Sequence, residues 1–176
     1  MSIEILGLTG KAGSGKDTVG AYLRQHYGFE TIAFATKLKN VAREVFLWDG
    51  VKDERGRRLL QRLGTEVGRD YDPNIWIQWA ERYIGRCRIS NPHQRFVITD
   101  VRFPNEAFWI QSQGGKMLRV WGRGGLTGDA AKHPSEIAIA DYAPDYCVCN
   151  NSDFETLYAW VDETMVTLGV SQRVLV

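Results

Sequence analysis

The sequence is poor in cysteine. Three cysteines in 176 residues are too few, and odd in number, for a disulfide framework, so we expect a reducing compartment. Cys147 and Cys149 stand two residues apart in an apparent strand. We interpret them as small buried side chains rather than as metal ligands.

The sequence also lacks long apolar runs and an excess of either charge. No apolar stretch approaches the roughly 20 residues that cross a bilayer, and residues 1–4 lack the basic start of a signal peptide. The chain has 22 Lys and Arg against 21 Asp and Glu, whereas proteins that bind long nucleic acids usually carry a clear basic excess. We therefore expect a cytoplasmic protein with no membrane partner and no polymeric nucleic acid partner.

What the sequence does contain is a regular alternation of short apolar runs and amphipathic segments. Its length of 176 residues fits a single domain. The apolar runs predict strands at residues 3–9, 29–34, 96–100, 116–121 and 146–149. Helices are expected at 15–27, 36–47 (capped by Thr36), 54–68, 73–86, 104–113 and 153–168, with a short one from Pro134. This alternation predicts an α/β fold with a mostly parallel β-sheet flanked by helices.

The strongest motif is GKAGSGKDT at residues 10–18, between an expected strand and an expected helix. That context is what a phosphate-binding P-loop requires. Gly10, Gly13 and Gly15 let the backbone curl around Ser14, so that its N–H groups point at phosphate oxygens, and the helix N-terminus adds partial positive charge. Lys16 would reach the β and γ phosphates. The motif therefore predicts an ATP site with Lys16 as a catalytic residue.

The motif departs from its usual form directly after the lysine. Ser or Thr normally follows and binds Mg²⁺, but here Asp17 stands in that place and the hydroxyl comes one residue later, at Thr18. Asp17 would help to hold Mg²⁺ or orient a substrate group; alternatively, it only favours the positive end of the helix dipole. Asp100 ends the strand pattern FVITD, and such an acid helps to position Mg²⁺ in P-loop proteins, although it could simply end the strand. We expect Mg²⁺ as a cofactor, with Asp17, Thr18 and Asp100 at the metal.

Further polar residues follow Asp100 at the carboxyl end of its strand, the edge at which open α/β sheets bind ligands. Arg102 is expected to hold a phosphate and to act in catalysis with Asp17 and Asp100. Glu106 is expected to pair with an arginine or to bind a sugar hydroxyl. A salt-bridged start of a helix is the alternative for both residues.

The helix expected at 54–68 has two different faces. One carries Leu59, Leu60, Leu63 and Val67, and the other carries Arg58, Gln61, Arg62, Thr65 and Arg69. Gly64 and Gly68 interrupt the helix, each at about 1 kcal/mol relative to Ala, which would suit the close approach of a ligand or another backbone. A solvated helix face is the other interpretation. Trp76 is either a core residue or a platform on which a base stacks.

The stretch GRGGLTGDAAKH at residues 122–133 is rich in glycine and lacks apolar periodicity, which predicts a mobile loop. Its glycines would let it close over the site and exclude water. Arg119 or Arg123, which flank this loop, would then reach over the transferring group. From its position after the last strand, Asn150 is expected to contact the edge of the adenine base.

Four stretches together resemble the bacteriophage deoxynucleoside monophosphate kinases. They are GKAGSGKDT at 10–18, LLQRLGTEVGRDYDPNIW at 59–76, ITDVRFPNEA at 98–107 and HPSE at 133–136. The P-loop is shared with many kinases, whereas the central stretch is much more specific. The resemblance spans residues 1 to about 165 and implies the P-loop nucleoside monophosphate kinase fold. It also implies transfer of the γ-phosphate of ATP to a deoxynucleoside monophosphate, giving the diphosphate and ADP, with Mg²⁺.

The resemblance further implies the acceptor site and the organisation of the chain. Residues around the monophosphate and its base would be Arg57, Arg58, Gln61, Gly64, Thr65, Arg69 and Trp76, with Asp100, Arg102 and Glu106 completing the site. The single domain, residues 1–176, would contain a helical insert that binds the acceptor at about 36–92 and a lid-like loop at about 122–135. If a phage encodes the protein, the host cytoplasm is its compartment.

Other functions share the P-loop and stay open at this point. A different small-molecule kinase, such as a dephospho-coenzyme A kinase, would not need the region around Gly64, Thr65 and Trp76. A non-catalytic nucleotide-binding module or switch is a second alternative, although the Asn-Lys-x-Asp motif of guanine-specific switches is missing. The near-neutral charge weighs against a nucleic-acid end kinase. The sequence leaves open the accepted bases and the oligomeric state, with a homodimer as one option.

Overall fold

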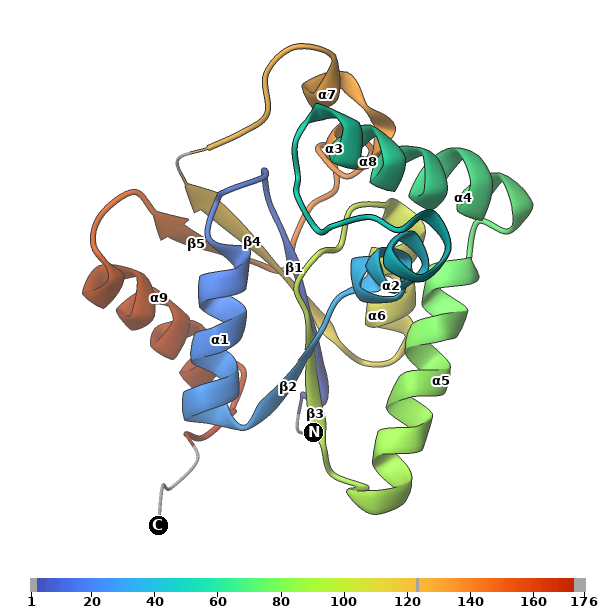
Figure 1. The fold of residues 1–176 in the computed structure, drawn as a ribbon. Coiled ribbons are helices and arrows are strands. Elements are labelled where there is room, and N and C mark those ends of the chain that lie inside the picture. The colour runs from blue at the N-terminus through green and yellow to red at the C-terminus, as the bar shows by residue number, and fades with distance from the viewer. Residues whose placement is uncertain (1–2, 123, 173–176) are drawn as a thin grey trace.

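The computed structural model describes residues 3–122 and 124–172, and a five-stranded sheet forms its centre (Figure 1). The strands are β1 (Ile5–Thr9), β2 (Phe29–Ile32), β3 (Arg95–Ile98), β4 (Lys116–Gly122) and β5 (Tyr146–Asn150). They lie in the order β2-β3-β1-β4-β5, and every neighbouring pair is parallel. The carboxyl ends of the strands therefore meet at one edge, and the predicted α/β fold with a parallel sheet is confirmed.

Helices cover both faces of this sheet. On one face, α1 (Lys16–Tyr27) and α9 (Phe154–Thr167) pack over a cluster that includes Leu6 and Leu8 of β1. On the other face, α5 (Ile75–Ser90) and α6 (Pro104–Ser112) pack over a cluster that includes Ile5. Successive residues of a strand point to opposite faces, so a strand covered on both sides is apolar at nearly every position. Within the described ranges, no helix is both long and apolar enough to span a membrane.

A run of helices connects β2 to β3 and lies beside the carboxyl edge of the sheet (Figure 1). It consists of α2 (Phe34–Phe46), α3 (Glu54–Gln61), the π-helical η1 (Arg62–Val67), α4 (Gly68–Tyr71) and α5. The predicted start of α2 was wrong, because the helix begins at Phe34, with Ala33 in the N-cap position, and not after Thr36.

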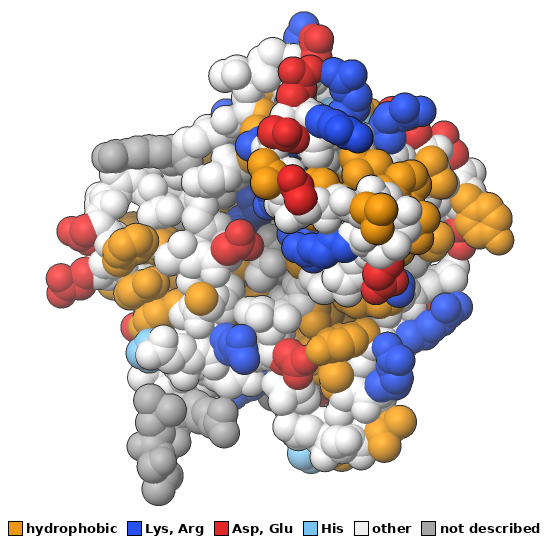
Figure 2. Space-filling view, viewed as in Figure 1, with side chains coloured by type: hydrophobic (Ala, Val, Ile, Leu, Met, Phe, Trp, Pro, Cys, Tyr) orange, Lys and Arg blue, Asp and Glu red, His pale blue; other side chains and the backbone are white. Residues whose placement is uncertain are grey.

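The helix predicted at 54–68 continues to Tyr71 and changes from α to π geometry at Arg62. A π-helix has more residues per turn than an α-helix, so the residues that follow are rotated away from their expected faces. The predicted division of faces was therefore wrong in part: Val67 is 61% exposed, in a region where Figure 2 shows apolar side chains at the surface. Gly64 and Gly68 are approached by side chains, since added Cβ atoms would lie 3.0 Å from Leu38 and 2.8 Å from Trp76.

The segment between β4 and β5 is partly helical. It contains α7 (Asp129–Lys132) and α8 (Pro134–Ile137), which lie near α3 in Figure 1, so the stretch predicted as an open loop includes a helical turn. Arg123, one of the two arginines expected to reach over the site, lies outside the described residues.

The edge strand β5 explains why one expectation about cysteine fails. Val148 packs against the cluster under α9, whereas Cys147 and Cys149 point to the opposite face and are exposed. The sequence pattern of an apolar strand could not reveal that only one face of this strand is covered.

Gly7 in β1 tests how closely α6 packs on the sheet. A methyl group there would meet the Met117 sulfur and lie 2.7 Å from Ile110 Cδ1. Gly7→Ala should therefore lower the free energy of unfolding, measured in urea, by about 1–3 kcal/mol, the usual penalty for overpacking a core. Gly85→Ala is the control, because nothing lies within 4 Å of that exposed helical position, and it should stabilise the protein by about 0.5–1 kcal/mol. Unchanged stability of Gly7→Ala would show that α6 has room to move.

Candidate active site

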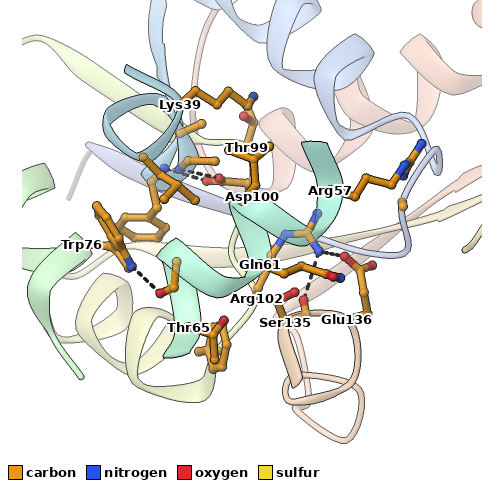
Figure 3. Close-up of a pocket in the computed structure, with 18 of the residues that line it drawn as sticks. Lys39, Arg57, Gln61, Thr65, Trp76, Thr99, Asp100, Arg102, Ser135 and Glu136 are labelled. Atoms are coloured by element: carbon orange, nitrogen blue, oxygen red, sulfur yellow. Dashed lines mark hydrogen bonds and ion pairs between the residues drawn. The ribbon is translucent and has the colours of Figure 1, made fainter. Parts of the chain in front are cut away.

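A cavity of about 300 Å³ lies at the carboxyl edge of the sheet, where the P-loop faces α2, α3 and η1. Side chains from segments far apart in the sequence converge on it (Figure 3), and basic and acidic side chains are interspersed over α3 and α7 above it (Figure 2). The predicted site residues that line it are Gly13, Lys16, Asp17, Arg57, Gln61, Gly64, Thr65, Arg69, Trp76, Asp100, Arg102 and Glu106. Those that do not are Gly10, Ser14, Gly15, Thr18, Arg58, Arg119 and Asn150.

The P-loop has the curled backbone that its glycines predict. Gly10, Gly13 and Gly15 have φ angles of 140°, 76° and 104°, which side chains on L-residues rarely permit. The loop is braced from β5, because the Asn150 amide nitrogen donates to the Ser14 carbonyl at 2.9 Å. A Cβ atom at Gly15 would run into this amide. Asn150 therefore supports the P-loop, and its expected contact with an adenine edge stays a prediction.

Lys16 is folded back onto the loop that precedes it. Its Nζ donates to the carbonyl oxygens of Gly10 and Lys11, both at 2.7 Å, and the residue is only 9% exposed. Burial lowers the pKa of Lys16, and the nearby Arg102 lowers it further, against the opposing effect of Asp17 and other acids. The ammonium group thus stands at the floor of the cavity, where two carbonyls hold it without neutralising its charge.

Asp17 and Thr18 occupy the first turn of α1. Asp17 is exposed and lines the cavity, and no hydrogen bond or ion pair to it is found among the described residues. Thr18 is half-buried and lies outside the cavity lining. The carboxylate of Asp17 is therefore available to a ligand, in addition to its favourable place at the N-terminus of α1.

Asp100 supplies the cap of α2 that the sequence assigned to Thr36. Its two carboxylate oxygens accept hydrogen bonds from the backbone amides of Phe34 and Ala35, each at 2.8 Å (Figure 3). Burial raises the pKa of Asp100, whereas the two amides lower it. This carboxylate ties the first turn of α2 to the end of β3.

Glu106 forms the second fixed point at this edge and is only 1% exposed. One oxygen accepts from the Arg69 guanidinium, and the other accepts from the amides of Arg102 and Phe103 at 2.7 and 3.0 Å. The Arg69 guanidinium also stacks over the Phe103 ring at 3.8 Å. Burial raises the pKa of Glu106, and Arg69 opposes this shift. Of the two roles expected for Glu106, the structure therefore shows the pairing with an arginine.

Arg102 joins the end of β3 to the segment that carries α8. Its Nη1 donates to the Ser135 carbonyl at 3.0 Å and to the Glu136 carboxylate (Figure 3). Its side chain is 33% exposed, so it is still open to the cavity. The expected salt bridge exists, but its partner comes from the HPSE stretch.

The acceptor residues expected on the 54–76 segment divide into two groups. Gln61 and Thr65 line the cavity, and the described residues offer their side chains no hydrogen-bond partner. Arg57 lines it too, with Nε donating to the Lys52 carbonyl at 2.8 Å. Arg58 instead faces solvent and pairs with Glu54, four residues earlier on the helix.

Trp76 combines the two interpretations that the sequence allowed. It is 9% exposed, belongs to the core cluster under α5 and donates its Nε1–H to the Gly64 carbonyl at 3.0 Å. It also forms part of the cavity wall. The hydrogen bond of its indole ties Trp76 to η1, and stacking of a base on Trp76 stays a prediction.

Arg119 does not line this cavity, and its expected movement over the transferring group stays a prediction. Its Nη2 donates to the carbonyls of Ile139 and Tyr142, and its Cζ lies 5.6 Å from the Trp121 ring centroid. It lines a second, smaller cavity of about 180 Å³ behind the P-loop, together with Gly10 and Ser14. Arg119 therefore holds the turn that follows α8.

The sequence missed several residues that the fold brings to the cavity. Lys39 and Lys52 line it from the helical segment, and Leu126, Ser135 and Glu136 line it from the segment between β4 and β5. Burial lowers the pKa of Lys39, followed by the effect of Lys52. Only Ser135 and Glu136 had a signal, since the HPSE stretch contributed to the resemblance; no spacing pattern distinguishes Lys39 from other lysines on α2.

Solved structures with the same architecture include protein TT1252 from Thermus thermophilus and dephospho-CoA kinase from Campylobacter jejuni. The first has a TM-score of 0.55 and 20% identity, and the match covers 96% of this chain and 99% of that chain. The second has a TM-score of 0.55 and 13% identity, and the match covers 94% and 96% of the two chains. These likenesses show the fold of the P-loop kinases.

Sequence comparison is more specific. The family model described as deoxynucleotide monophosphate kinase matches residues 47–161. A putative deoxynucleotide monophosphate kinase of Acanthamoeba polyphaga mimivirus is 31% identical over 182 residues, and the match covers 89% of this chain and 93% of that protein. The chain therefore belongs to the deoxynucleotide monophosphate kinase family.

Proposed function

We propose that this kinase transfers the γ-phosphoryl group of ATP to a deoxynucleoside monophosphate, giving ADP and the deoxynucleoside diphosphate. The observation that carries the proposal is a single cavity of about 300 Å³ that holds both the P-loop lysine and the residues of the helical segment. Phosphoryl transfer needs donor and acceptor phosphates in one desolvated space, in line with each other. Membership of the family supports this acceptor.

On the donor side, the P-loop would bind the phosphates through its backbone amides and the N-terminus of α1. Lys16 would leave the carbonyls of Gly10 and Lys11 and donate to the β and γ oxygens, which carry the charge that those carbonyls lack. Asn150 would keep the loop in shape throughout.

The residues next to the P-loop fit Mg²⁺. The ion prefers hard oxygen ligands, and the unpaired carboxylate of Asp17 faces the cavity beside the hydroxyl residue Thr18. Asp100 stands nearby, and each of its oxygens keeps a lone pair beyond the amide that it accepts. When bound, Mg²⁺ would neutralise charge on the transferring phosphoryl group.

On the acceptor side, we propose that residues 36–92 form the insert that binds the monophosphate. Arg57, Arg102 and Lys39 are cations that line the cavity and could face the acceptor phosphate. Gln61 and Thr65 are neutral and unpaired, so they would serve the sugar and the base. Arg58 is left out, because it lies on the outer face of α3.

The chemistry would proceed without a covalent enzyme intermediate. An oxygen of the acceptor phosphate forms a bond to the γ phosphorus while the bond from that phosphorus to the β–γ bridging oxygen breaks, and ADP leaves with the electron pair. The protein would supply positive charge and alignment rather than a nucleophile. Residues 122–135 would act as the lid that excludes water, since Leu126 and Ser135 already border the cavity, as does Glu136 directly after them.

Release of ADP from ATP and Mg²⁺ should depend on the acceptor. We expect turnover with one or more deoxynucleoside monophosphates, weaker turnover with ribonucleoside monophosphates, and none with dephospho-coenzyme A. A coupled ADP assay over the full panel also defines the base range. If dephospho-coenzyme A were the only acceptor that released ADP, the assignment of the acceptor would be wrong although the P-loop would stand.

Lys16→Met should reduce kcat at least about a hundredfold, because the charge at the β and γ oxygens is lost while the aliphatic stem still packs. The control is Lys37→Met, an exposed lysine on α2 outside the cavity, which should keep kcat within about twofold. Thermal unfolding of both variants checks the fold, since Lys16 is buried. Near-normal turnover of Lys16→Met would remove the central claim of a catalytic P-loop.

Asp100→Asn separates the capping role of this residue from its proposed place at the metal. An amide offers one acceptor oxygen, so it would leave the Phe34 or Ala35 amide without its partner. The free energy of unfolding without nucleotide should fall by about 1–3 kcal/mol. Asp70→Asn, on an exposed position of α4, should change it by less than about 0.5 kcal/mol. A stable Asp100→Asn variant that needs more Mg²⁺ would instead favour the metal role alone.

A further inference from the structure

Glu136 is an acid in a cavity that is proposed to hold two anionic substrates. A carboxylate in such a place repels phosphate unless a nearby positive charge offsets its own charge. The purposes of the other acids that line the cavity are visible. Asp100 caps α2, Glu106 holds Arg69 and the start of α6, and Asp17 is the free carboxylate beside the P-loop.

The purpose of Glu136 is connected with Arg102, to which it is bound. Its Oε1 accepts from Arg102 Nη1, and the Ser135 carbonyl accepts from the same nitrogen at 3.0 Å. The Glu136 side chain is 13% exposed, so the pair is largely shielded from water. Among the described residues, Arg102 is the ion-pair partner of Glu136, and Figure 3 shows the three residues converging at the edge of the cavity.

The contact between Arg102 and Glu136 leaves one edge of the Arg102 guanidinium free to bind a ligand. With Nη1 engaged by α8, the edge formed by Nε–H and Nη2–H has no partner among the described residues. Two parallel N–H groups on one edge match two oxygens of a phosphate. A guanidinium that is pinned on one side can present such an edge in a fixed direction, whereas an unpinned side chain would lose rotamer freedom each time that it bound.

We propose that Glu136 is a positioning residue, which fixes Arg102 so that its free edge receives the acceptor phosphate when the segment carrying α8 covers the cavity. The inference rests on the proposed function. The contact that closes the lid would therefore also orient the Arg102 side chain. When the lid is open, Arg102 would lose this contact and its side chain would no longer be held in one orientation. The nearby charge of Glu136 also offsets the repulsion that Arg102 exerts on Lys16.

The test compares Glu136→Gln and Glu136→Ala in the native and Arg102→Ala backgrounds, with steady-state kinetics for the best deoxynucleoside monophosphate. Glu136→Gln keeps the shape and an acceptor oxygen but loses the charge. We expect kcat/KM for the acceptor to fall about tenfold in Glu136→Gln and further in Glu136→Ala, with KM for ATP within about twofold. The control is Asp141→Asn, an exposed acid between β4 and β5 that lies outside the proposed lid and should behave as the native protein.

The Arg102→Ala background provides the decisive result. If Glu136 acts through Arg102, Glu136→Ala should change kcat/KM there by less than about twofold. An equal loss in both backgrounds would show that Glu136 only stabilises α8 and would overturn the proposal. Faster acceptor turnover in Glu136→Gln would also overturn it, since the carboxylate would then be a competitor of the substrate.

These outcomes are distinct from failure of the proposed function. If the native protein releases no ADP with any deoxynucleoside monophosphate, both proposals fall together. If the native protein is active and Glu136→Gln matches Asp141→Asn, only the role of Glu136 is wrong. Thermal midpoints of all variants show whether a loss reflects unfolding, and the conservative Glu136→Gln decides the matter if Glu136→Ala does not fold.

Discussion

Two carboxylates after β3, the half-buried Asp100 and the buried Glu106, hold the helical segment between β2 and β3 to the sheet. Asp100 accepts from the first two amides of α2, and Glu106 accepts from Arg69 in α4. A carboxylate that is shielded from water destabilises the fold when it loses its partners, so both contacts resist separation. The helical segment between β2 and β3 is thus fixed near its beginning and again at α4. The placement of Lys39, Gln61 and Thr65 around the cavity follows from these two anchors.

The same contacts set the charge of the cavity. Because amides and a guanidinium offset the charges of Asp100 and Glu106, the cations that line the cavity are left to act on a ligand; they include Lys16, Lys39 and Arg57. Two unit charges 4 Å apart attract by about 4 kcal/mol at an effective dielectric constant of 20. A few such contacts can bind a phosphate firmly although the whole chain carries a net charge of only +1. A chain of near-neutral composition can therefore have a cavity in which cations outnumber acids, because the fold gathers the cations and pairs the nearest acids with amides and arginines.

The sequence predicted the parts of the structure that local chemistry decides. The P-loop follows from glycines, a strand and a helix within about a dozen residues, and the parallel sheet follows from apolar runs that alternate with amphipathic ones. The sequence-based prediction failed where a residue far away in the sequence determines the local structure. The cap of α2 comes from Asp100, which is 66 residues away from Phe34, so Thr36 was chosen on local grounds alone. Contacts between distant residues were likewise not visible in the sequence: Leu38 approaches Gly64 of η1, Trp76 donates to the Gly64 carbonyl, and Asn150 donates to Ser14, 136 residues away.

Similarity of fold does not by itself specify which molecule accepts the phosphate. The dephospho-CoA kinase from Campylobacter jejuni matches 94% of this chain at only 13% identity, so the sheet and the P-loop do not by themselves specify what receives the phosphate. The family model begins at residue 47 and includes α3, η1 and α4, which form one wall of the cavity. In that wall, Gln61 of α3 and Thr65 of η1 line the cavity, whereas Arg58 of α3 faces solvent. A regular α-helix would rotate Thr65 and the residues after it differently, so the π geometry of η1 shapes this wall of the cavity.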